Sequence, residues 1–166
     1  LTLVEEYGVA TAPALNGATV VEISPDGDHV YVGSFLTDAI AVFERDAGTG
    51  ELTLVEEVVD GAGGVDGLDG VRWLDLSPDG AIFYATGRED NALAVFSRSA
   101  STGQLTFVEA QKDGVGGVDG LFTASGVAVS PNGEQVYVSG AGEEEVAVFN
   151  RNVTTGALAF VTTVAP

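Results

Sequence analysis

Residues 52–104 read LTLVEEVVDGAGGVDGLDGVRWLDLSPDGAIFYATGREDNALAVFSRSASTGQ, and this stretch decides the fold because it recurs along the chain. A shift of 53 residues places it on the following stretch without a gap, so that Phe96 and Arg98 fall on Phe149 and Arg151. Periods of this size indicate a repeat architecture, in which each unit is one supersecondary element that buries its apolar faces against its neighbours.

The repeat extends in both directions. An earlier copy, residues 1–51, fits after a two-residue deletion within residues 8–13, and a further copy begins at Leu158 and stops at Pro166. Each copy contains four short runs that alternate apolar and polar residues or are rich in β-formers, which predicts four strands. The predicted outer strands are residues 1–6, 52–57, 105–109 and 158–162, and the predicted inner strands are residues 19–23, 71–76 and 126–129. The first middle strands are residues 30–33, 82–86 and 136–139, and the second middle strands are residues 40–43, 93–96 and 146–149.

Two recurring turns join these strands. SPDG at residues 24–27 and 77–80, and SPNG at residues 130–133, place proline second and glycine fourth, as a type I turn favours. A second turn around Thr49-Gly50 recurs one and two periods later and returns the chain to the next outer strand. Each inner strand is therefore expected to form a hairpin with the strand that follows it.

Four strands per period, joined by short turns, predict an all-β fold made of β-propeller blades, each a four-stranded antiparallel meander. Phe43, Phe96 and Phe149 share one repeat position, so we expect them to be buried at equivalent places between the sheets. The chain would hold three repeats of about 53 residues plus one extra outer strand. A parallel β-helix would repeat at a shorter period, and a sandwich would not repeat its turns so closely. We expect a single propeller segment over residues 1–166, with the outer strand at 1–7 and blades at 18–58, 71–110 and 124–163.

Three blades are too few to close a ring, since propellers typically have four to eight. One alternative is that the chain is an excerpt of a longer propeller, which the missing initiator methionine also favours. The other is that copies join head to tail through their blade edges. The partners predicted from the repeat are therefore further blades of the same protein or copies of this chain.

The succession of SPDG, VYV, xAVF and the Thr-Gly turn before LTFVE resembles the YVTN-type repeats of the seven-bladed lactonase-like β-propellers. The resemblance covers the whole chain. It implies enzymes that open sugar lactones with polar and charged residues on one face of a full ring, but no motif of such a site stands out here. The only histidine, His29, lies beside the SPDG turn and is expected to be a solvent-exposed turn residue.

Charge limits the partners that this chain can have. There are 25 acidic residues against six basic ones, a formal net charge of −19, which disfavours nucleic acid and anionic membranes. Three of the cations, Arg45, Arg98 and Arg151, share one repeat position, so we expect them to be structural. No apolar run is long enough to insert into a membrane, and cysteine is absent. An acidic, lysine-poor surface suits an extracellular or cell-surface protein, or simply a very soluble one.

The meander places the loops before each inner strand and between the two middle strands on one face, where carboxylates gather. The loops GAGGVDGLDG (61–70) and GVGGVDG (114–120) combine carboxylates with flexible backbone, a ligand set suited to calcium. The candidate metal ligands are Asp60, Asp66, Asp69, Asp113 and Asp119. The alternatives are ordinary loop carboxylates or a surface for a cationic partner.

Two functions remain open. The composition favours a non-enzymatic scaffold, an extracellular binding or assembly module that self-associates or forms part of a larger propeller. The alternative is a lactonase-like hydrolase acting on sugar lactones. Glu22 and Asp75 occupy the same position of the inner strand, with Ala128 in the third copy, and are either catalytic acids or polar lining of the channel.

Overall fold

The computed structural model describes residues 6, 8 and 10–165. Of the predicted leading strand, residues 1–7, only Glu6 is described, so that prediction falls outside the described part of the chain. The elements are a 3₁₀ turn η1 (Pro13–Leu15) and the strands β1 (Ala18–Ile23), β2 (His29–Ser34), β3 (Ala39–Arg45), β4 (Leu52–Val59), β5 (Val71–Leu76), β6 (Ile82–Gly87), β7 (Ala92–Arg98), β8 (Leu105–Lys112), β9 (Ala124–Val129), β10 (Gln135–Gly140), β11 (Glu145–Arg151) and β12 (Leu158–Val164).

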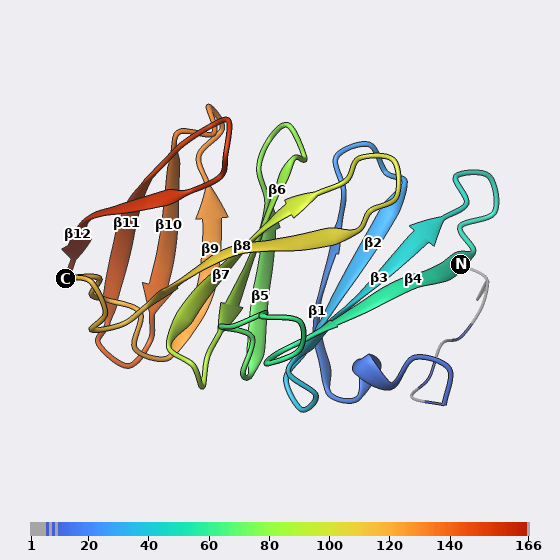
Figure 1. The fold of residues 1–166 in the computed structure, drawn as a ribbon, viewed down its shortest axis with the longest axis horizontal. Coiled ribbons are helices and arrows are strands. Elements are labelled where there is room, and N and C mark those ends of the chain that lie inside the picture. Colours follow the sequence, from blue (N-terminus) through green and yellow to red (C-terminus); the bar gives the residue numbers. More distant parts are fainter. Residues whose placement is uncertain (1–5, 7, 9, 166) are drawn as a thin grey trace.

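The strands form three four-stranded sheets in sequence order, β1–β4, β5–β8 and β9–β12, and neighbouring strands within each are antiparallel (Figure 1). We call these sheets the first, second and third blades. No α-helix occurs among the described residues. The predicted fold class, propeller blades built as antiparallel meanders, is confirmed.

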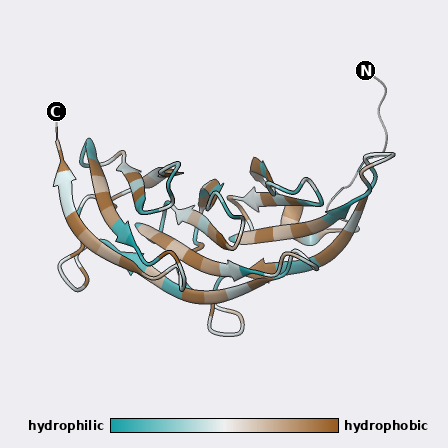
Figure 2. Cartoon of the chain, turned by 90° about the horizontal axis from the view of Figure 1, so that it is seen from above, coloured by the Kyte–Doolittle hydropathy of each residue, from teal (hydrophilic) through white to brown (hydrophobic). Residues whose placement is uncertain are grey.

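The strand register repeats along with the sequence. In each blade the pairing of the third strand with the outer strand shifts at the xAVF phenylalanine: between Val42 and Phe43, Val95 and Phe96, and Val148 and Phe149. Such irregularities increase the local right-handed twist of a sheet. Seen from above, the three twisted blades follow one another along an arc (Figure 2).

The first turn of each blade closes as the sequence predicts. Gly27, Gly80 and Gly133 donate their backbone N–H groups to the carbonyl oxygens of the serines three residues earlier, at 2.7–2.8 Å. All three glycines have φ between 67° and 79°, which side chains rarely tolerate. The Ser24 hydroxyl also accepts a hydrogen bond from the backbone N–H of His29 at 3.0 Å, which ties the turn to the start of β2.

The core lies between the blades. Phe43, Phe96 and Phe149 are at most 1% exposed, as predicted from their shared repeat position. Phe96 and Phe149 each meet an aromatic ring of their own outer strand edge-to-face, with ring centroids 5.6 Å apart. One apolar cluster joins the first blade to the second and another joins the second to the third, so each sheet is buried against its neighbour.

Each blade has a forward face, by which we mean the side that faces the next blade in the sequence. Tyr31 on the forward face of the first blade packs against Phe83 of the second blade, with the two rings tilted at 46° and their centroids 4.7 Å apart. Its hydroxyl donates a hydrogen bond to the carbonyl oxygen of Gly103 at 2.9 Å. The equivalent Tyr84 is also fully buried, whereas Tyr137 of the third blade is 40% exposed.

Carboxylates of the outer strands join successive blades. Glu56 of β4 accepts a hydrogen bond from the backbone N–H of Leu105 at the start of β8, at 2.7 Å. Glu109 of β8 accepts the equivalent bond from Leu158 at the start of β12, also at 2.7 Å. In both cases the acceptor belongs to the earlier blade and the donor to the later one.

The loops between the two middle strands make a second connection of this kind. Asp38 accepts a hydrogen bond from the backbone N–H of Gly70 at 2.9 Å, and the Asn91 amide oxygen accepts one from Thr123 at 2.7 Å. Asp38 and Asn91 have φ of 52° and 51°. Acidic and amide side chains tolerate this left-handed region better than most, which explains the residue types found there.

Arg98 reaches from the second blade into the first. Its Nε donates to the Tyr31 hydroxyl at 2.7 Å, its Nη1 donates to the Gly80 carbonyl at 3.2 Å, and its Nη2 donates to both carboxylate oxygens of Asp26 at 2.9 and 3.1 Å. Nη2 also lies 2.9 Å from His29 Nδ1. The guanidinium is thus almost completely enclosed by groups that accept its protons.

The other two arginines keep only part of this arrangement. Arg45 and Arg151 donate Nη1 to the glycine carbonyl of their own SP turn, at 3.2 and 2.9 Å. Arg151 Nη2 lies 3.8 Å from Asp79, and its Nε and Nη2 have no hydrogen-bond partner. The three arginines therefore share a hydrogen bond to the glycine carbonyl of their own blade. Within the described residues, only Arg98 also forms hydrogen bonds with the preceding blade.

Gly103 and Gly50 provide a test of how closely the blades pack. Both lie in the Thr-Gly turn with φ of 72° and 81°, but a Cβ at Gly103 would lie 2.2 Å from the His29 ring, whereas nothing lies within 4 Å of one at Gly50. We expect Gly50→Ala to lower the free energy of unfolding by about 1–2 kcal/mol through backbone strain. Gly103→Ala should cost about 1–3 kcal/mol more through overpacking. Urea denaturation measures both, and equal losses would contradict the packing described.

Candidate functional site

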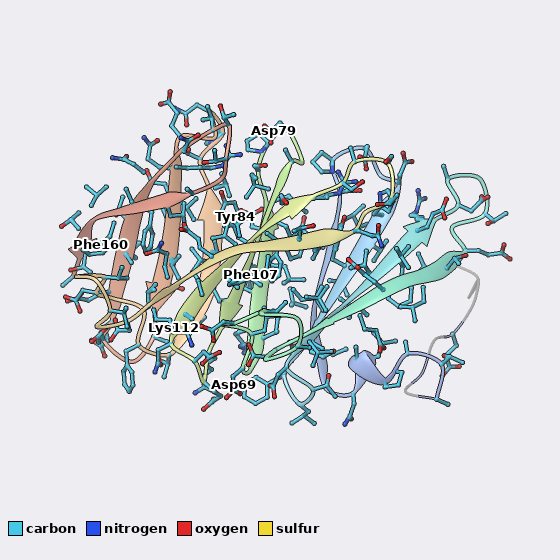
Figure 3. The ribbon with its side chains drawn as sticks, viewed as in Figure 1. Asp69, Asp79, Tyr84, Phe107, Lys112 and Phe160 are labelled. Atoms are coloured by element: carbon cyan, nitrogen blue, oxygen red, sulfur yellow. The ribbon has the colours of Figure 1, made fainter. Side chains whose placement is uncertain are left out.

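The predicted metal ligands all lie at one end of the blades. Figure 3 shows Asp69 and Lys112 at this end and Asp79, in a proline turn, at the other. We call the former the acidic loop face and define it by the loops 60–70, 88–91, 113–123 and 141–144. Because strand direction alternates, loops that are distant in sequence are neighbours here.

Two of the predicted ligands are engaged by the backbone of their own loops. Asp60 Oδ1 accepts a hydrogen bond from the N–H of Leu68 at 2.9 Å, and Asp113 Oδ1 accepts the equivalent bond from Leu121 at 3.0 Å. These bonds hold each glycine-rich loop in shape so that Leu68 and Leu121 are fully buried. Asp60 and Asp113 thus have a structural task that the sequence pattern did not show.

The first acidic cluster consists of Asp60, Asp66 and Asp90, and one carboxylate oxygen from each lies within 4.8 Å of the other two. Lys112 is its counter-ion, because Nζ donates to Asp66 at 2.7 Å and to Asp90 at 3.2 Å. The bond to Asp66 is the main reason why the pKa of Lys112 is raised. This cluster already holds a cation of its own.

The second acidic cluster consists of Asp113, Asp119 and Glu143 at the same spacing. One repeat after Lys112 the chain has Ala165, so the lysine of the first cluster has no counterpart here. Loss of hydration, followed by repulsion from Asp113, raises the pKa of the exposed Glu143. The remaining predicted ligand, Asp69, belongs to neither cluster, and burial followed by repulsion from Asp38 and Asp90 raises its pKa.

Calcium binding at the acidic loop face stays a prediction. If it occurs, millimolar calcium should raise the melting temperature more than matched magnesium, because Mg²⁺ dehydrates reluctantly and suits large flexible oxygen sites poorly. Asp119→Asn should remove the difference, whereas Asp66→Asn, whose carboxylate is already paired with Lys112, should leave it. Equal shifts with both ions would reduce the effect to charge screening.

A different pair of carboxylates lies on the inner strands. Glu22 of β1 and Asp75 of β5 are both partly buried. Burial, followed by repulsion from Asp75, raises the pKa of Glu22, and burial raises the pKa of Asp75. Two interacting carboxylates in such surroundings are less readily ionised than in water, as is often seen for groups that transfer protons in enzymes.

The two carboxylates differ in their hydrogen bonds. Asp75 accepts one from the N–H of Leu76 at 2.8 Å and one from the N–H of Val129 in β9 at 2.7 Å. Both of its oxygens are thus occupied, and the bond to Val129 joins the second blade to the third. Glu22 makes no hydrogen bond with a neighbouring blade among the described residues. Of the two carboxylates, Glu22 is therefore the better candidate for a reactive group.

His29 is not the exposed turn residue that the sequence predicts. It begins β2, is 3% exposed, and lies beneath Gly103 of the next blade. Because Arg98 donates to Nδ1, the ring must carry its proton on Nε2. Burial, followed by the charge of Arg98, lowers the pKa of His29 and keeps the ring neutral. His29 therefore serves the interface between blades, far from the acidic loop face.

A hollow of about 450 Å³ lies beside the inner strands. Its outer part is formed by Tyr137 and Val146 on the forward face of the third blade, where Tyr31 and Tyr84 of the other blades are covered by their successors. Its inner part is formed by Trp73 of β5 and by Ser125, Gly126 and Ala128 of β9. The sequence-based reasoning singled out neither Trp73 nor the serines, since none of them forms a known motif.

The sequence matches the model of the family described as lactonase, 7-bladed β-propeller, over residues 2–119 and again over residues 65–165. The chain belongs to the lactonase seven-bladed β-propeller family. The two overlapping matches are what a repeating lactonase-family chain produces when it is aligned in two registers, and together they span nearly the whole sequence.

Among the relatives of this lactonase-family chain are two curated proteins and several solved structures. It is 32% identical to the 6-phosphogluconolactonase of Bacillus subtilis over 90 residues, and 29% identical to a probable 6-phosphogluconolactonase of Arthroderma benhamiae over 90 residues. The periplasmic gluconolactonase of Pseudomonas aeruginosa superimposes with a TM-score of 0.79 at 29% identity, covering 93% of this chain and 41% of that structure.

The lactonase-family chain is shorter than these relatives. The matches cover 54% and 51% of this chain but only 24% and 21% of the two curated proteins. Propellers with other names also share the fold: Sqt1 of Saccharomyces cerevisiae superimposes with a TM-score of 0.70 at 9% identity, which shows the fold alone. The arrangement of blades is therefore common to many proteins, while the sequence match points to lactonases.

These comparisons overturn one sequence-based prediction about the lactonase-family chain. The preference for a non-enzymatic scaffold is wrong, because the matching family and the relatives named above are lactonases. The alternative, a lactonase-like hydrolase, is the better supported one. The described residues contain no helix long and apolar enough to cross a membrane.

Proposed function

We propose that this chain contributes blades to a hydrolase that opens sugar lactones. The observation that carries the proposal is the match of nearly the whole sequence to the lactonase propeller family. The named relatives are gluconolactonases and 6-phosphogluconolactonases, so a gluconolactone, with or without a phosphate, is the substrate class that they support.

The reaction needs little from the protein in the way of special chemistry. Water adds to the lactone carbonyl carbon, the ring C–O bond breaks, and the released ring oxygen takes up a proton to give an open-chain acid. A carboxylate that accepts a proton from the attacking water acts as a general base, and it does so best when its pKa lies closer to the working pH than usual. Glu22, on an inner strand with a raised pKa, fits this role.

Sugar lactones also hydrolyse without a catalyst, so the test must subtract that background. We expect the purified protein, with every blade that it carries, to release acid from D-glucono-1,5-lactone, followed in a pH-stat, faster than buffer does and in proportion to protein concentration. The same chain, unfolded by heat, is the control. A rate equal to that control over a range of aldonolactones would contradict the proposal.

Association through blade edges remains a proposal about partners. The support comes from the forward face of the third blade, where Tyr137 is exposed although its counterparts Tyr31 and Tyr84 are covered by the next blade. Further blades of the same protein or another copy of this chain would cover it. A cationic partner for the acidic loop face, the absence of a nucleic-acid partner and a location outside the cell stay predictions from the net charge of −19.

A further inference from the structure

His29 is enclosed in the interface between the first and second blades, which we call the first joint. It begins β2 and is 3% exposed, and a Cβ at Gly103 of the second blade would collide with its ring. Histidine is the side chain whose ordinary titration lies closest to neutral pH. The first joint therefore encloses a group that can gain a charge in mild acid.

The proton on His29 determines whether Arg98 can keep its contacts. Arg98 Nη2 lies 2.9 Å from His29 Nδ1, and only a neutral ring can accept a hydrogen bond there. When both ring nitrogens carry protons, two cations face each other at this distance inside the joint. Arg98 also donates to Tyr31 and Asp26 of the first blade, so the repulsion disturbs the hydrogen bonds that hold the two blades together.

The charged groups around the ring act in both directions. Three carboxylates of the first blade favour the protonated ring: Asp26 and Asp28 in the preceding turn, and Glu44, which pairs with His29 in the sheet. Burial, followed by the charge of Arg98 from the second blade, opposes protonation and prevails, so the pKa of His29 is lowered.

The other elements packed on the joint add no further cation at the ring. The turn 99–104, which covers the ring, has no charged residue. Asp79, in the SP turn of the second blade, lies nearest to Arg151 of the third blade. Glu56 of β4 accepts a hydrogen bond from the Leu105 N–H within the joint. Arg98 is thus the cation that a protonated ring would meet.

A lowered pKa means that acid weakens the closed joint. In an open joint the ring meets water and titrates at its ordinary pKa of 6.5, whereas the closed joint resists the proton. Because the open form binds more protons, the equilibrium shifts towards it below this pH, by at most about tenfold for each pH unit. Asp26, with a pKa of about 2, stays ionised until the solution is far more acidic.

The carboxylates of the inner strands have the opposite effect. Glu22 of the first blade and Asp75 of the second repel each other across the first joint, and both pKa values are raised. The closed form therefore binds protons at these two groups more readily than the open form does, so acid stabilises the closed joint through them. An opening of the joint in mild acid must come from another group.

The interface between the second and third blades, the second joint, is a natural control. Ile82 occupies the repeat position of His29 and lies beneath the Thr-Gly turn at Gly156 in the same way. Arg151 occupies the position of Arg98, but its Nη2 has no hydrogen-bond partner in the described structure. Isoleucine does not titrate, so the second joint lacks this response to acid.

We propose that the contact between His29 and Arg98 is a pH-sensitive switch, through which mild acid opens the first joint while the second joint stays closed. Because Glu22 and Asp75 lie on opposite sides of the first joint, its opening separates these two carboxylates. This behaviour goes beyond lactone hydrolysis and does not depend on it.

Hydrogen exchange can follow each joint through one backbone N–H. Leu105 donates across the first joint to Glu56, and Leu158 donates across the second to Glu109, both at 2.7 Å. The sample is the purified protein with every blade that it carries. Between about pH 7.5 and about pH 5.5, we expect the protection factor of Leu105, corrected for the intrinsic exchange rate, to fall about 3- to 10-fold more than that of Leu158.

Variants taken from the other blades test the role of the ring. His29→Gln introduces the residue of the third blade, which keeps an acceptor for Arg98 but takes up no proton in this range. Leu105 should then lose its excess pH dependence. Ile82→His is the reciprocal change and should make the protection of Leu158 fall in acid by a similar factor.

The comparison of the two joints decides the outcome. Equal losses of protection at Leu105 and Leu158 would show general loosening in acid and would overturn the proposal, as would a Leu105 N–H that does not respond. A response that persists in His29→Gln would assign the proton to another group. If that variant fails to fold, His29→Ile serves instead. Lactone turnover enters none of these measurements, so failure of the proposed hydrolysis leaves them unchanged.

Discussion

Replacing Arg98 by alanine should lower the free energy of unfolding by about 2–4 kcal/mol, because a buried guanidinium loses its hydrogen bonds to the partly exposed carboxylate of Asp26 and to two buried acceptors. The side chain is 1% exposed and crosses from the second blade to the first. Its loss would leave Asp26, the Tyr31 hydroxyl and His29 without their shared donor. Burial opposes ionisation of Asp26, but the bonds from Ser24 and Arg98 outweigh it and lower the pKa of Asp26 to about 2.

Arg45→Ala is the matched control, since Arg45 occupies the same repeat position. In the described structure its guanidinium donates to the Gly27 carbonyl of its own blade and makes no hydrogen bond to another blade. This substitution should cost well under half as much in the same urea titration. Arg98→Lys keeps the charge but loses the planar fork, so its stability should lie between wild type and Arg98→Ala. Equal effects of Arg45→Ala and Arg98→Ala would show that the interface contacts contribute nothing.

Glu22→Gln should lower kcat for lactone hydrolysis by about 10²- to 10⁴-fold, the usual contribution of a general base. Stability should not fall, because the amide has nearly the shape of the carboxylate and removes a charge that burial and Asp75 disfavour. The base must be deprotonated to act, so the wild-type rate should decline as the pH falls through the raised pKa of Glu22. Asp75→Asn should shift this decline to lower pH by removing the repulsion.

Asp75→Asn itself is expected to behave in the opposite way to Glu22→Gln. An asparagine has one acceptor oxygen where Asp75 uses two, so the N–H of Leu76 or of Val129 would lose its partner. Its main effect should therefore be on the melting temperature, which differential scanning fluorimetry measures. If Glu22→Gln retained full activity, the general base would have to be sought elsewhere in the molecule.

The fold was predictable because the repeat supplies three independent copies of the same evidence. The SP turns, the xAVF strands and the Thr-Gly turns recur at one period, and each is a local signal of backbone geometry. Burial of Phe96 followed from its shared position with Phe43 and Phe149. The gathering of Asp60 and Asp66 with Asp90 also follows from strand direction alone, since a meander returns alternate loops to one face.

Contacts between blades were not predictable from the local sequence. His29 looks like an exposed turn residue in the sequence, because the turn at Gly103 that covers its ring lies more than a whole repeat away along the chain. Asp60 and Asp113 look like metal ligands in the sequence, yet each accepts a hydrogen bond from the backbone N–H of the residue eight positions later. A carboxylate in a glycine-rich loop has the same composition whether it binds a cation or the loop itself.

Function was missed for a related reason. Lactone opening requires a positioned carboxylate and water, which leave no contiguous motif of the kind that marks a nucleophile elbow or a metal site. Glu22 and Asp75 were recognised as a pair, but their environment became visible only once the inner strands were placed side by side. The acidic surface, which favoured a scaffold, says nothing about chemistry near the axis.

Among the described residues, the side-chain oxygens that form hydrogen bonds between blades belong to the earlier blade, and this gives the chain a direction of assembly. Asp38, Glu56 and Asp75 present acceptors that the next blade fills with backbone N–H groups. A blade leaving the ribosome would therefore find a finished docking surface in its predecessor. Domains are synthesised at about 5–20 residues per second, so a period of 53 residues gives each blade several seconds to dock before the next emerges.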